Sequence, residues 1–524
     1  MNEKEALRTS EEYREALKRM KPTIIKDRVL ENPFDDEDIQ KGMNVVALSY
    51  DLARDEKYRD IMTVTSPFTG KVINRFNHIP FTSEDLKKKQ QMIHILAREV
   101  FCAQRCVGGD ALTTLFVGTY KVDKSNKFET DYHERFKKYL TYIQDNDISP
   151  CGAVTDGKGD RSLMPAEQPE RDSYVHIVKE TDEGIYVSGV KIPITMSLYS
   201  EEIIAIPGLQ YNKDNADCAV AFAVPADAEG VEIYVLGPEI KSLKGKMSPT
   251  HGRKYLNKEG MIVFNNVFVP KERVFMCGEH RFAATFANMF ANLHRFAYTA
   301  CKPAVYENLT GAAMLISEYN GTRGEYFLSN NSDKSFEIYK TAITVRGMCK
   351  AAIEDSYETE SGALMPDPVF ANMGKYISSE NFHKAISLVQ DMAGGLPPNL
   401  PYEQLLENKD LRDRMAKLLN RKKGITIEDQ YALNELIRVL VASNEGGLLQ
   451  FGSKHGGGNK EAEKVAIYAN SLRAMNACKN CVQQMSQEYR LDAEDEADRQ
   501  EKPAGETASQ QEPKMSRETK VSQE

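Results

Sequence analysis

The stretch SEDLKKKQQMIHILAREVFCAQRC, residues 83–106, joins a strong helical pattern to a pair of cysteines. Ser83 and Glu84 suit the N-terminal cap and the first turn of a helix. Apolar residues then recur every three or four positions, as on one helical face, at Met92, Ile93, Leu96, Val100 and Phe101. Cys102 and Cys106 follow at the end of that helix or just beyond it. The stretch therefore predicts a helix that brings two thiols to one place.

A second pair of soft ligands lies in NLHRFAYTACK, residues 292–302, where His294 and Cys301 are seven positions apart. On an α-helix, residues four or seven positions apart share one face. If both segments are helical, two helices can each present two ligands to one point. Three thiolates and an imidazole suit an iron–sulfur cluster or a zinc ion, and ordinary buried cysteines are the alternative.

The composition is that of a folded, water-soluble protein. At 524 residues the chain is too long for one ordinary core, and its 41% hydrophobic and 28% charged residues are typical of globular proteins. A net charge of −9 gives no argument for nucleic-acid binding. We find no apolar run long enough for a membrane span and no apolar signal region at the N-terminus. Nine cysteines without regular spacing suggest a reducing cytoplasm rather than a disulfide framework.

Four regions differ in their patterns and predict an α+β multidomain fold. Residues 1–150 are mostly helical, and residues 151–280 form a β domain with strands in SYVHIVKET, GIYVSGVKIPIT, CAVAFAVP, VEIYVLG and GMIVFNNVFVP. Residues 281–490 are expected to form a helical bundle, with one continuous helix across 426–453. Residues 491–524 contain few large apolar side chains and are expected to be a disordered polar tail.

This order of a helical N-terminal domain, a β domain and a helical bundle resembles the acyl-CoA dehydrogenase fold. Individual segments resemble the 4-hydroxybutyryl-CoA dehydratase/vinylacetyl-CoA Δ-isomerase branch of the 4-hydroxyphenylacetate 3-hydroxylase flavoprotein family. They lie within residues 70–305 and are INRFNHIPFTSEDL, CAQRCVGGDAL, DYHERF, AVTDGKGDRS, EGMIVFNNVFVPKERVFMCGE and HRFAYTACK. The paired Cys–x3–Cys and His–x6–Cys spacing separates the dehydratase branch from the flavin monooxygenases of the same fold.

The resemblance implies an FAD and a 4Fe-4S cluster, with Cys102, Cys106, His294 and Cys301 as the cluster ligands. It implies dehydration of 4-hydroxybutyryl-CoA, or a related short hydroxyacyl-CoA, to crotonyl-CoA through a flavin-generated radical, together with vinylacetyl-CoA Δ-isomerase activity. It also implies a homotetramer built as two dimers. The alternatives are an FADH2-dependent aromatic monooxygenase, a related radical dehydratase or isomerase acting on another acyl-CoA, and a non-catalytic relative.

Family roles extend to four further expectations about side chains around the ligands. His294 is expected to accept a proton when it is not a ligand, and Tyr298 lies one turn further along the same helix. Lys302 follows the last cysteine and is expected to hold negative charge on the substrate or cluster, and Glu259 is the matching carboxylate. The competing interpretations are a Tyr298 that only packs, a solvated Lys302 and an ordinary loop acid at Glu259.

The flavin expectations rest on three segments. AVTDGKGDRS resembles the loop beside the flavin ring in this fold, and its expected contacts are Ala153, Val154, Thr155, Asp156, Gly159, Asp160, Arg161 and Ser162. Thr195 matches a threonine near the flavin N5. Gly394 and Gly395 resemble an element that reaches the FAD of a neighbouring subunit, and simple helix termination is the alternative.

One position departs from the family pattern. The dehydratase branch carries a second glutamate just before a His-Gly turn, and LLQFGSKHGGG places Gly452 at that position. The missing carboxylate weakens the expectation of 4-hydroxybutyryl-CoA as substrate and of dehydration itself, although Gln450 or His455 could replace it from one turn away. Elsewhere, Cys478 and Cys481 form a lone CxxC pair, which we interpret as structural thiols.

Overall fold

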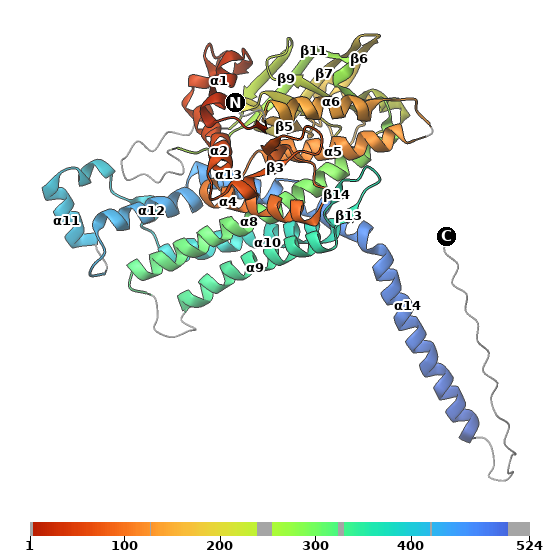
Figure 1. Ribbon diagram of the computed structural model, residues 1–524. Coiled ribbons are helices and arrows are strands. Elements are labelled where there is room, and N and C mark those ends of the chain that lie inside the picture. Colours follow the sequence, from red (N-terminus) through yellow and green to blue (C-terminus); the bar gives the residue numbers. More distant parts are fainter. Residues whose placement is uncertain (1–3, 126, 238–253, 323–329, 420–421, 501–524) are drawn as a thin grey trace. The chain divides into compact units, whose positions relative to one another are not determined.

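The computed structural model describes residues 4–125, 127–237, 254–322, 330–419 and 422–500, with only the backbone of 487–500. It divides into two compact units, residues 1–467 and 468–524, and each is described by itself. In the first unit the β-sheets lie on one side and the long helices α8, α9 and α10 on the other, with α4 and α5 between them (Figure 1). The expected α+β architecture is confirmed.

The N-terminal region is mainly helical, as predicted. Thr82, rather than Ser83, caps α4, because the Thr82 Oγ1 accepts a hydrogen bond from the backbone N–H of Asp85 at 3.1 Å and Asp85 reciprocates. A small three-stranded sheet, not anticipated from the sequence, has the order β1 (Glu5–Ala6), β4 (Val72–Asn74) and β3 (Thr63–Thr65). The helices are α1 (Ser10–Arg19), α2 (Glu37–Arg54), α3 (Arg59–Met62), α4 (Ser83–Val100), α5 (Cys106–Asp123) and α6 (Tyr132–Asp145).

Two sheets form the central region, and all the strands predicted there are confirmed. The five-stranded sheet has the order β2 (Thr23–Ile25), β10 (Val231–Val235), β11 (Glu259–Pro270), β7 (Gly184–Thr195) and β6 (His176–Thr181). The four-stranded sheet has the order β12 (Val274–Cys277), β9 (Val220–Pro225), β8 (Glu202–Ala205) and β5 (Pro150–Ala153). Strands β2, β5, β8 and β12 escaped prediction because runs of three or four residues are too short to show alternation.

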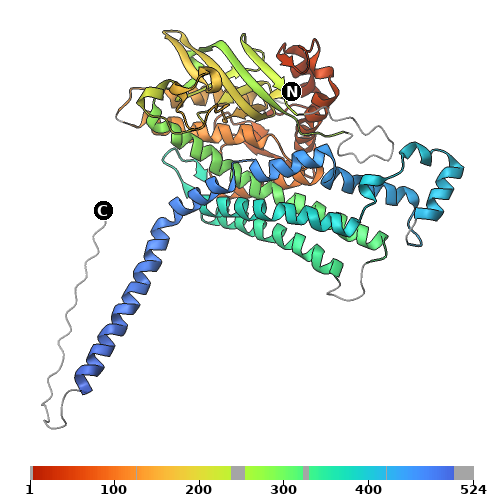
Figure 2. The ribbon, with the colours of Figure 1, turned by 180° about the vertical axis from the view of Figure 1, so that it is seen from behind.

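Helices α8, α9 and α10 pack lengthwise against one another, on the side of α4 and α5 that faces away from the sheets (Figure 2). The predicted helix over 426–453 is two helices, because the chain leaves helical geometry at Ala442 and Ser443 then caps a new start. Short strands β13 (Tyr357–Glu358) and β14 (Leu364–Met365) connect α9 to α10. The helices are α8 (His280–Tyr319), α9 (Asn330–Glu354), α10 (Pro368–Ala393), α11 (Lys409–Leu419), α12 (Ile427–Val441) and α13 (Asn444–His455).

The last helix, α14, runs from Lys460 to Gln500 and so continues past residue 490, where the disordered tail was expected to begin. The remainder of that expected tail, residues 501–524, lies outside the described residues. Cys478 and Cys481 are exposed on α14 as free thiols. Among the residues that the structure describes, no helix is both long and apolar enough to cross a membrane.

Helix α8 takes part in two apolar cores. Its first half packs in a large core that also includes the N-terminal helices and both sheets, and its second half packs with α10 and α12 in another. The secondary structure changes near the predicted boundaries, since β5 begins at Pro150 and α8 at His280. Because one core extends across residue 150 and residue 280, the division into separate domains stays a prediction.

Helix α5 meets the sheet with no side chain in between. A Cβ on Gly108 would overlap the carbonyl oxygen of Pro150, and a Cβ on Gly109 would lie 2.5 Å from the carbonyl oxygen of Phe76. These two glycines therefore let the backbone of α5 touch β5 and the segment after β4.

We predict that Gly108→Ala lowers the free energy of unfolding by about 1–3 kcal/mol or more, because the backbones must separate to admit a methyl group. The matched control is Gly311→Ala on α8, where, among the described residues and apart from the neighbouring backbone of the helix, no atom lies within 4 Å of the added Cβ. This control should be neutral or stabilising by up to about 1 kcal/mol, since alanine favours the helix. Chemical denaturation of both variants measures the difference, and equal stabilities would contradict the close approach.

Candidate functional site

The first cysteine pair lies at a break between two helices. Helix α4 ends at Phe101, whose φ of 64° is left-handed, and Gln104 has a φ of 44°. Cys102 therefore lies in the connecting loop, and Cys106 is the first residue of α5. The expectation that both cysteines follow at the end of the first helix or just beyond it is confirmed, but the two thiols do not share one helical face, because the break separates them. Nothing in the sequence marked the break, because left-handed positions usually carry glycine or asparagine.

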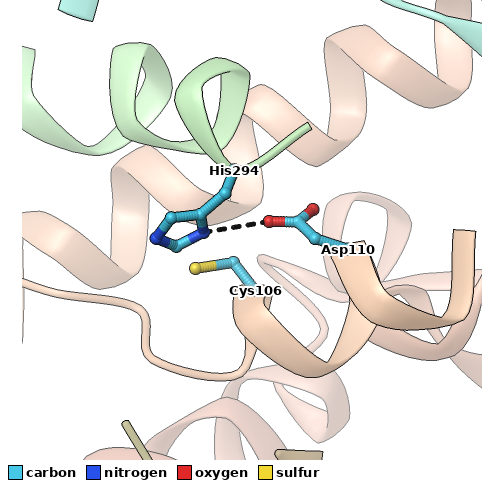
Figure 3. Close-up of side chains that lie close together, drawn as sticks. All are labelled: Cys106, Asp110 and His294. Carbon is cyan, nitrogen blue, oxygen red and sulfur yellow. Dashed lines mark hydrogen bonds and ion pairs between the residues drawn. The ribbon is translucent and has the colours of Figure 1, made fainter. Parts of the chain in front are cut away.

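The second pair lies on one helix, as expected. His294 and Cys301 are both on α8. The Cys301 Sγ donates a hydrogen bond of 3.5 Å to the carbonyl oxygen of Phe101, and the Cys301 thiol is also within hydrogen-bonding reach of the Cys102 thiol. His294 faces the start of α5, where ligand atoms of Cys106, Asp110 and His294 all lie within 4.8 Å of one another (Figure 3). The four predicted ligands therefore converge from the 101–105 loop, α5 and α8.

Asp110 is a member of this group that sequence reasoning missed. Its Oδ2 lies 3.2 Å from the His294 Nδ1, and its Oδ1 accepts a hydrogen bond of 2.8 Å from the Lys89 Nζ. The side chain of Asp110 is fully buried, and burial alone would raise its pKa, but Lys89 and His294 lower it below the ordinary value. An ionised Asp110 fixes the His294 ring and directs its other nitrogen, Nε2, to a ligand position.

The three thiols differ in their ease of ionisation. The hydrogen bond from Cys301, together with the positive charge of Lys302, lowers the pKa of Cys102 to about 6. Burial raises the pKa of Cys106, and the hydrogen bond to Cys102 together with burial raises the pKa of Cys301. A thiolate at Cys102 beside two protonated thiols is a suitable starting state for soft-metal binding, which removes the remaining protons.

Tyr298 and Lys302 are buried on the same stretch of α8. Tyr298 donates a hydrogen bond to the carbonyl oxygen of Ser453, and its hydroxyl lies 3.3 Å from the Ser378 Oγ. The Lys302 Nζ lies 5.1 Å from the centre of the Tyr298 ring, and the Lys302 side chain is only 6% exposed. A solvated Lys302 is therefore excluded, and Tyr298 makes hydrogen bonds in addition to its packing contacts.

Glu259 lies at the end of the sheet that is near the cysteine loop. It is the first residue of β11, where it pairs with Thr195 at the end of β7, and its Oε1 accepts a hydrogen bond of 3.2 Å from the Thr195 Oγ1. Burial raises the pKa of Glu259, and the nearby Cys102 raises it further. The side chain is thus a partly buried carboxyl at the site and not an ordinary loop acid.

A buried ion pair supports the expected flavin loop, residues 153–162. The Lys191 Nζ lies 2.7 Å from Asp156 and donates hydrogen bonds to the carbonyl oxygens of Val154 at 2.8 Å and Ile206 at 3.0 Å. The side chain of Asp156 therefore supports the loop. Beyond it, the chain from Gly159 to Ser162 is exposed.

The remaining flavin candidates are placed in different layers. Ala153 ends β5, and Thr155 accepts a backbone hydrogen bond from Ile192 at 2.8 Å. The Asp160 carboxylate accepts a hydrogen bond of 2.7 Å from the Ser162 hydroxyl. Gly394, by contrast, ends α10 in the helical layer with a φ of 72°. In the part of the chain that the structure describes, no atom beyond the chain neighbours lies within 4 Å of a Cβ added at Gly394 or Gly395.

The chain is similar to known proteins over most of its length. Residues 9–276 match the family described as 4-hydroxyphenylacetate 3-hydroxylase N terminal, and residues 283–486 match 4-hydroxyphenylacetate 3-hydroxylase C terminal. The chain belongs to this family of enzymes. The oxygenase component of 4-hydroxyphenylacetate 3-monooxygenase from Thermus thermophilus is 28% identical over 69% of this chain and 73% of its own length.

Within the family, the chain is a dehydratase-like enzyme. It is 33% identical to 4-hydroxybutyryl-CoA dehydratase/vinylacetyl-CoA-Δ-isomerase of Clostridium aminobutyricum, over 88% of this chain and 96% of that protein. The structure of an oxygen-tolerant archaeal 4-hydroxybutyryl-CoA dehydratase from N. maritimus has a TM-score of 0.85 at 30% identity, covering 91% of this chain and 95% of that one. The FAD complex of a 4-hydroxyphenylacetate 3-monooxygenase oxygenase component shares the fold, with a TM-score of 0.81 at 22% identity, over 92% of this chain and 100% of that one.

We predict that Asp110→Asn lowers the free energy of unfolding by about 3–5 kcal/mol, because Lys89 is then buried without a counter-charge. The control is Asp145→Asn, which breaks the exposed 2.8 Å ion pair with Lys71 and should cost less than about 1 kcal/mol. Urea denaturation measures both losses. A loss for the first variant no larger than for the control would show that Asp110 is not ionised in the folded protein.

Proposed function

We propose that the protein is an FAD- and 4Fe-4S-dependent enzyme. It dehydrates 4-hydroxybutyryl-CoA, or a related short hydroxyacyl-CoA, to crotonyl-CoA and isomerises vinylacetyl-CoA to crotonyl-CoA. The observation that carries the proposal is the convergence of Cys102, Cys106, Cys301 and His294 from separate segments, with Glu259 beside them. A monooxygenase that uses only reduced flavin and oxygen has no need of this set.

The donor set fits an iron–sulfur cluster. Three thiols and one imidazole are the donor types of partly histidine-ligated clusters. Cys102, Cys106, Cys301 and the Nε2 of His294 would hold it, with Asp110 orienting the imidazole from the other nitrogen. When bound, the cluster supplies a Lewis acid for a departing hydroxyl group. A zinc ion is the alternative that the same ligands would accept.

The loop from Ala153 to Ser162, together with Thr195, would hold the FAD. Support comes from the exposed tip after the Lys191–Asp156 pair and from the position of Thr195 beside Glu259. When bound, FAD supplies the one-electron chemistry that makes an unactivated C–H bond acidic. We also propose a cytoplasmic homotetramer built as two dimers, in which Gly394 and Gly395 reach the FAD of a neighbouring subunit.

The side chains around the ligands supply proton transfer and charge. Glu259 holds a proton on its carboxyl group near neutral pH more readily than an exposed glutamate does, because its pKa is raised. Lys302 offers positive charge to the thioester carbonyl oxygen, and the Tyr298 hydroxyl faces the same side of α8. His294, whenever it is not a ligand, accepts a proton at Nε2. Isomerisation then needs removal of an α-proton and return of a proton at the γ-carbon.

The direct test is a substrate panel with anaerobically purified protein. We expect flavin and cluster absorption, iron and acid-labile sulfide, and conversion of vinylacetyl-CoA to crotonyl-CoA, with 4-hydroxybutyryl-CoA assayed beside it. Turnover of vinylacetyl-CoA alone would indicate another hydroxyacyl substrate, as the glycine at position 452 suggests. Absence of iron, with hydroxylation of a phenol by reduced flavin and oxygen, would replace this proposal with the monooxygenase alternative.

We further predict that Cys301→Ala loses most of the iron and the activity while the FAD stays bound, because one of four ligands is removed and the flavin loop lies elsewhere. The matched control is Cys349→Ala, which removes an equally buried thiol on α9. Iron, sulfide and flavin are measured on both variants. Full iron in the Cys301 variant would remove this residue from the ligand set.

A further inference from the structure

A second buried ion pair lies beside Tyr298. The Lys375 Nζ on α10 is 3.0 Å from the Glu463 Oε1 in the first turn of α14, and both side chains have 0% exposure. Among the described residues, neither carboxylate oxygen of Glu463 accepts a hydrogen bond of good geometry. Burial raises the pKa of Glu463 and lowers that of Lys375 to about 8. No part of the proposed function so far uses this pair.

Lys375 connects three segments at one point. Besides Glu463, its Nζ binds the Ser379 Oγ at 2.6 Å and the carbonyl oxygen of Lys454 at 3.0 Å. It also lies 4.5 Å from the centre of the Tyr298 ring. Tyr298 in turn donates its hydroxyl hydrogen to Ser453, the residue before Lys454. The Lys375–Glu463 ion pair, the Tyr298 ring and the end of α13 are therefore in mutual contact, so a change in one alters the position of the others.

The turn after α13 lies directly on the proposed cluster ligand. Gly457 has a φ of 74°, and a Cβ there would lie 3.3 Å from the Cδ2 of His294. The Arg295 Nε donates a hydrogen bond of 2.8 Å to the carbonyl oxygen of Gly457. Movement of this turn would therefore change the surroundings of His294.

The stability of the fold alone does not require a buried ion pair at this position. Removing a lysine and a glutamate from water costs several kcal/mol, and apolar residues of similar size often serve stability as well. Position 452, where a carboxylate was expected, carries an exposed glycine, and His455 is exposed and stacks on Phe451. Of the two proposed replacements, His455 is therefore exposed. Glu463, which was not among them, is a fully buried carboxylate connected through Lys375 to the carbonyl oxygen of Lys454 near the same turn.

We propose that Glu463 is a positioning residue of the reaction: through Lys375 it fixes the ring of Tyr298 and the 453–457 turn against His294. The assignment rests on the proposed function. Glu463 acts through its neighbours, so its removal should impair the step that needs an aligned Tyr298 and leave the binding of acyl-CoA largely intact.

The test is a double-mutant cycle on vinylacetyl-CoA isomerisation with the FAD- and iron-loaded enzyme. We expect Glu463→Gln to lower kcat by about tenfold to a hundredfold, as small misplacements do, with KM within about twofold. In the Tyr298→Phe background the same change should cause little further loss, because both act through one group. The control is Glu461→Gln, whose side chain is 75% exposed on the same helix and which should behave as wild type.

A second variant keeps the test decisive if Glu463→Gln does not fold. Lys375→Met combined with Glu463→Leu replaces the whole pair by apolar residues and should fold. It should show the same loss of kcat and the same lack of additivity with Tyr298→Phe. Wild-type kcat in either variant, or additive losses with Tyr298→Phe, would overturn the assignment while the proposed function stands. A loaded wild-type enzyme without isomerase activity would overturn both.

Discussion

The buried contact between Lys89 and Asp110 is the interaction on which the rest of the site depends. It connects α4 to α5, and the other oxygen of Asp110 reaches His294 on α8. Neither charge could remain inside the protein alone, because an unpaired buried ion costs several kcal/mol. The three helices that supply the ligand-bearing segments are therefore held together by one carboxylate, and the orientation of the imidazole follows from it.

Buried lysine–carboxylate ion pairs also support the other parts of the proposed site. Lys191 pairs with Asp156 under the flavin loop, and Lys375 pairs with Glu463 under the turn that covers His294. In both cases the lysine also binds backbone carbonyl oxygens, which satisfies its remaining hydrogens. Such pairs contribute little net stability, but they fix which segments meet. The flavin loop and the turn after α13 thereby gain the rigidity that ligand positions require.

Much of this arrangement could be predicted from the sequence, and the failures at the site itself share one cause. Alternation of β-branched residues identified the long strands, and a seven-residue spacing placed His294 and Cys301 on one helix. Asp110 and Glu463 gave no signal, because each is defined by partners far away along the chain, 184 positions for Asp110 and His294. The sequence also gave no indication of the helix break at Phe101, since the left-handed backbone of this residue is imposed by packing and not by local preference.

Helix α8 belongs to both apolar cores, and this has a thermodynamic consequence for cofactor retention. Cys301 lies in the large core, one turn before Val305, where α8 enters the second core. The proposed cluster would therefore link the unfolding of one core to that of the other. Free energy of ligation then appears as free energy of folding. The two cores would unfold together in a single melting transition while the cluster is bound. Loss of the cluster would separate this transition into two.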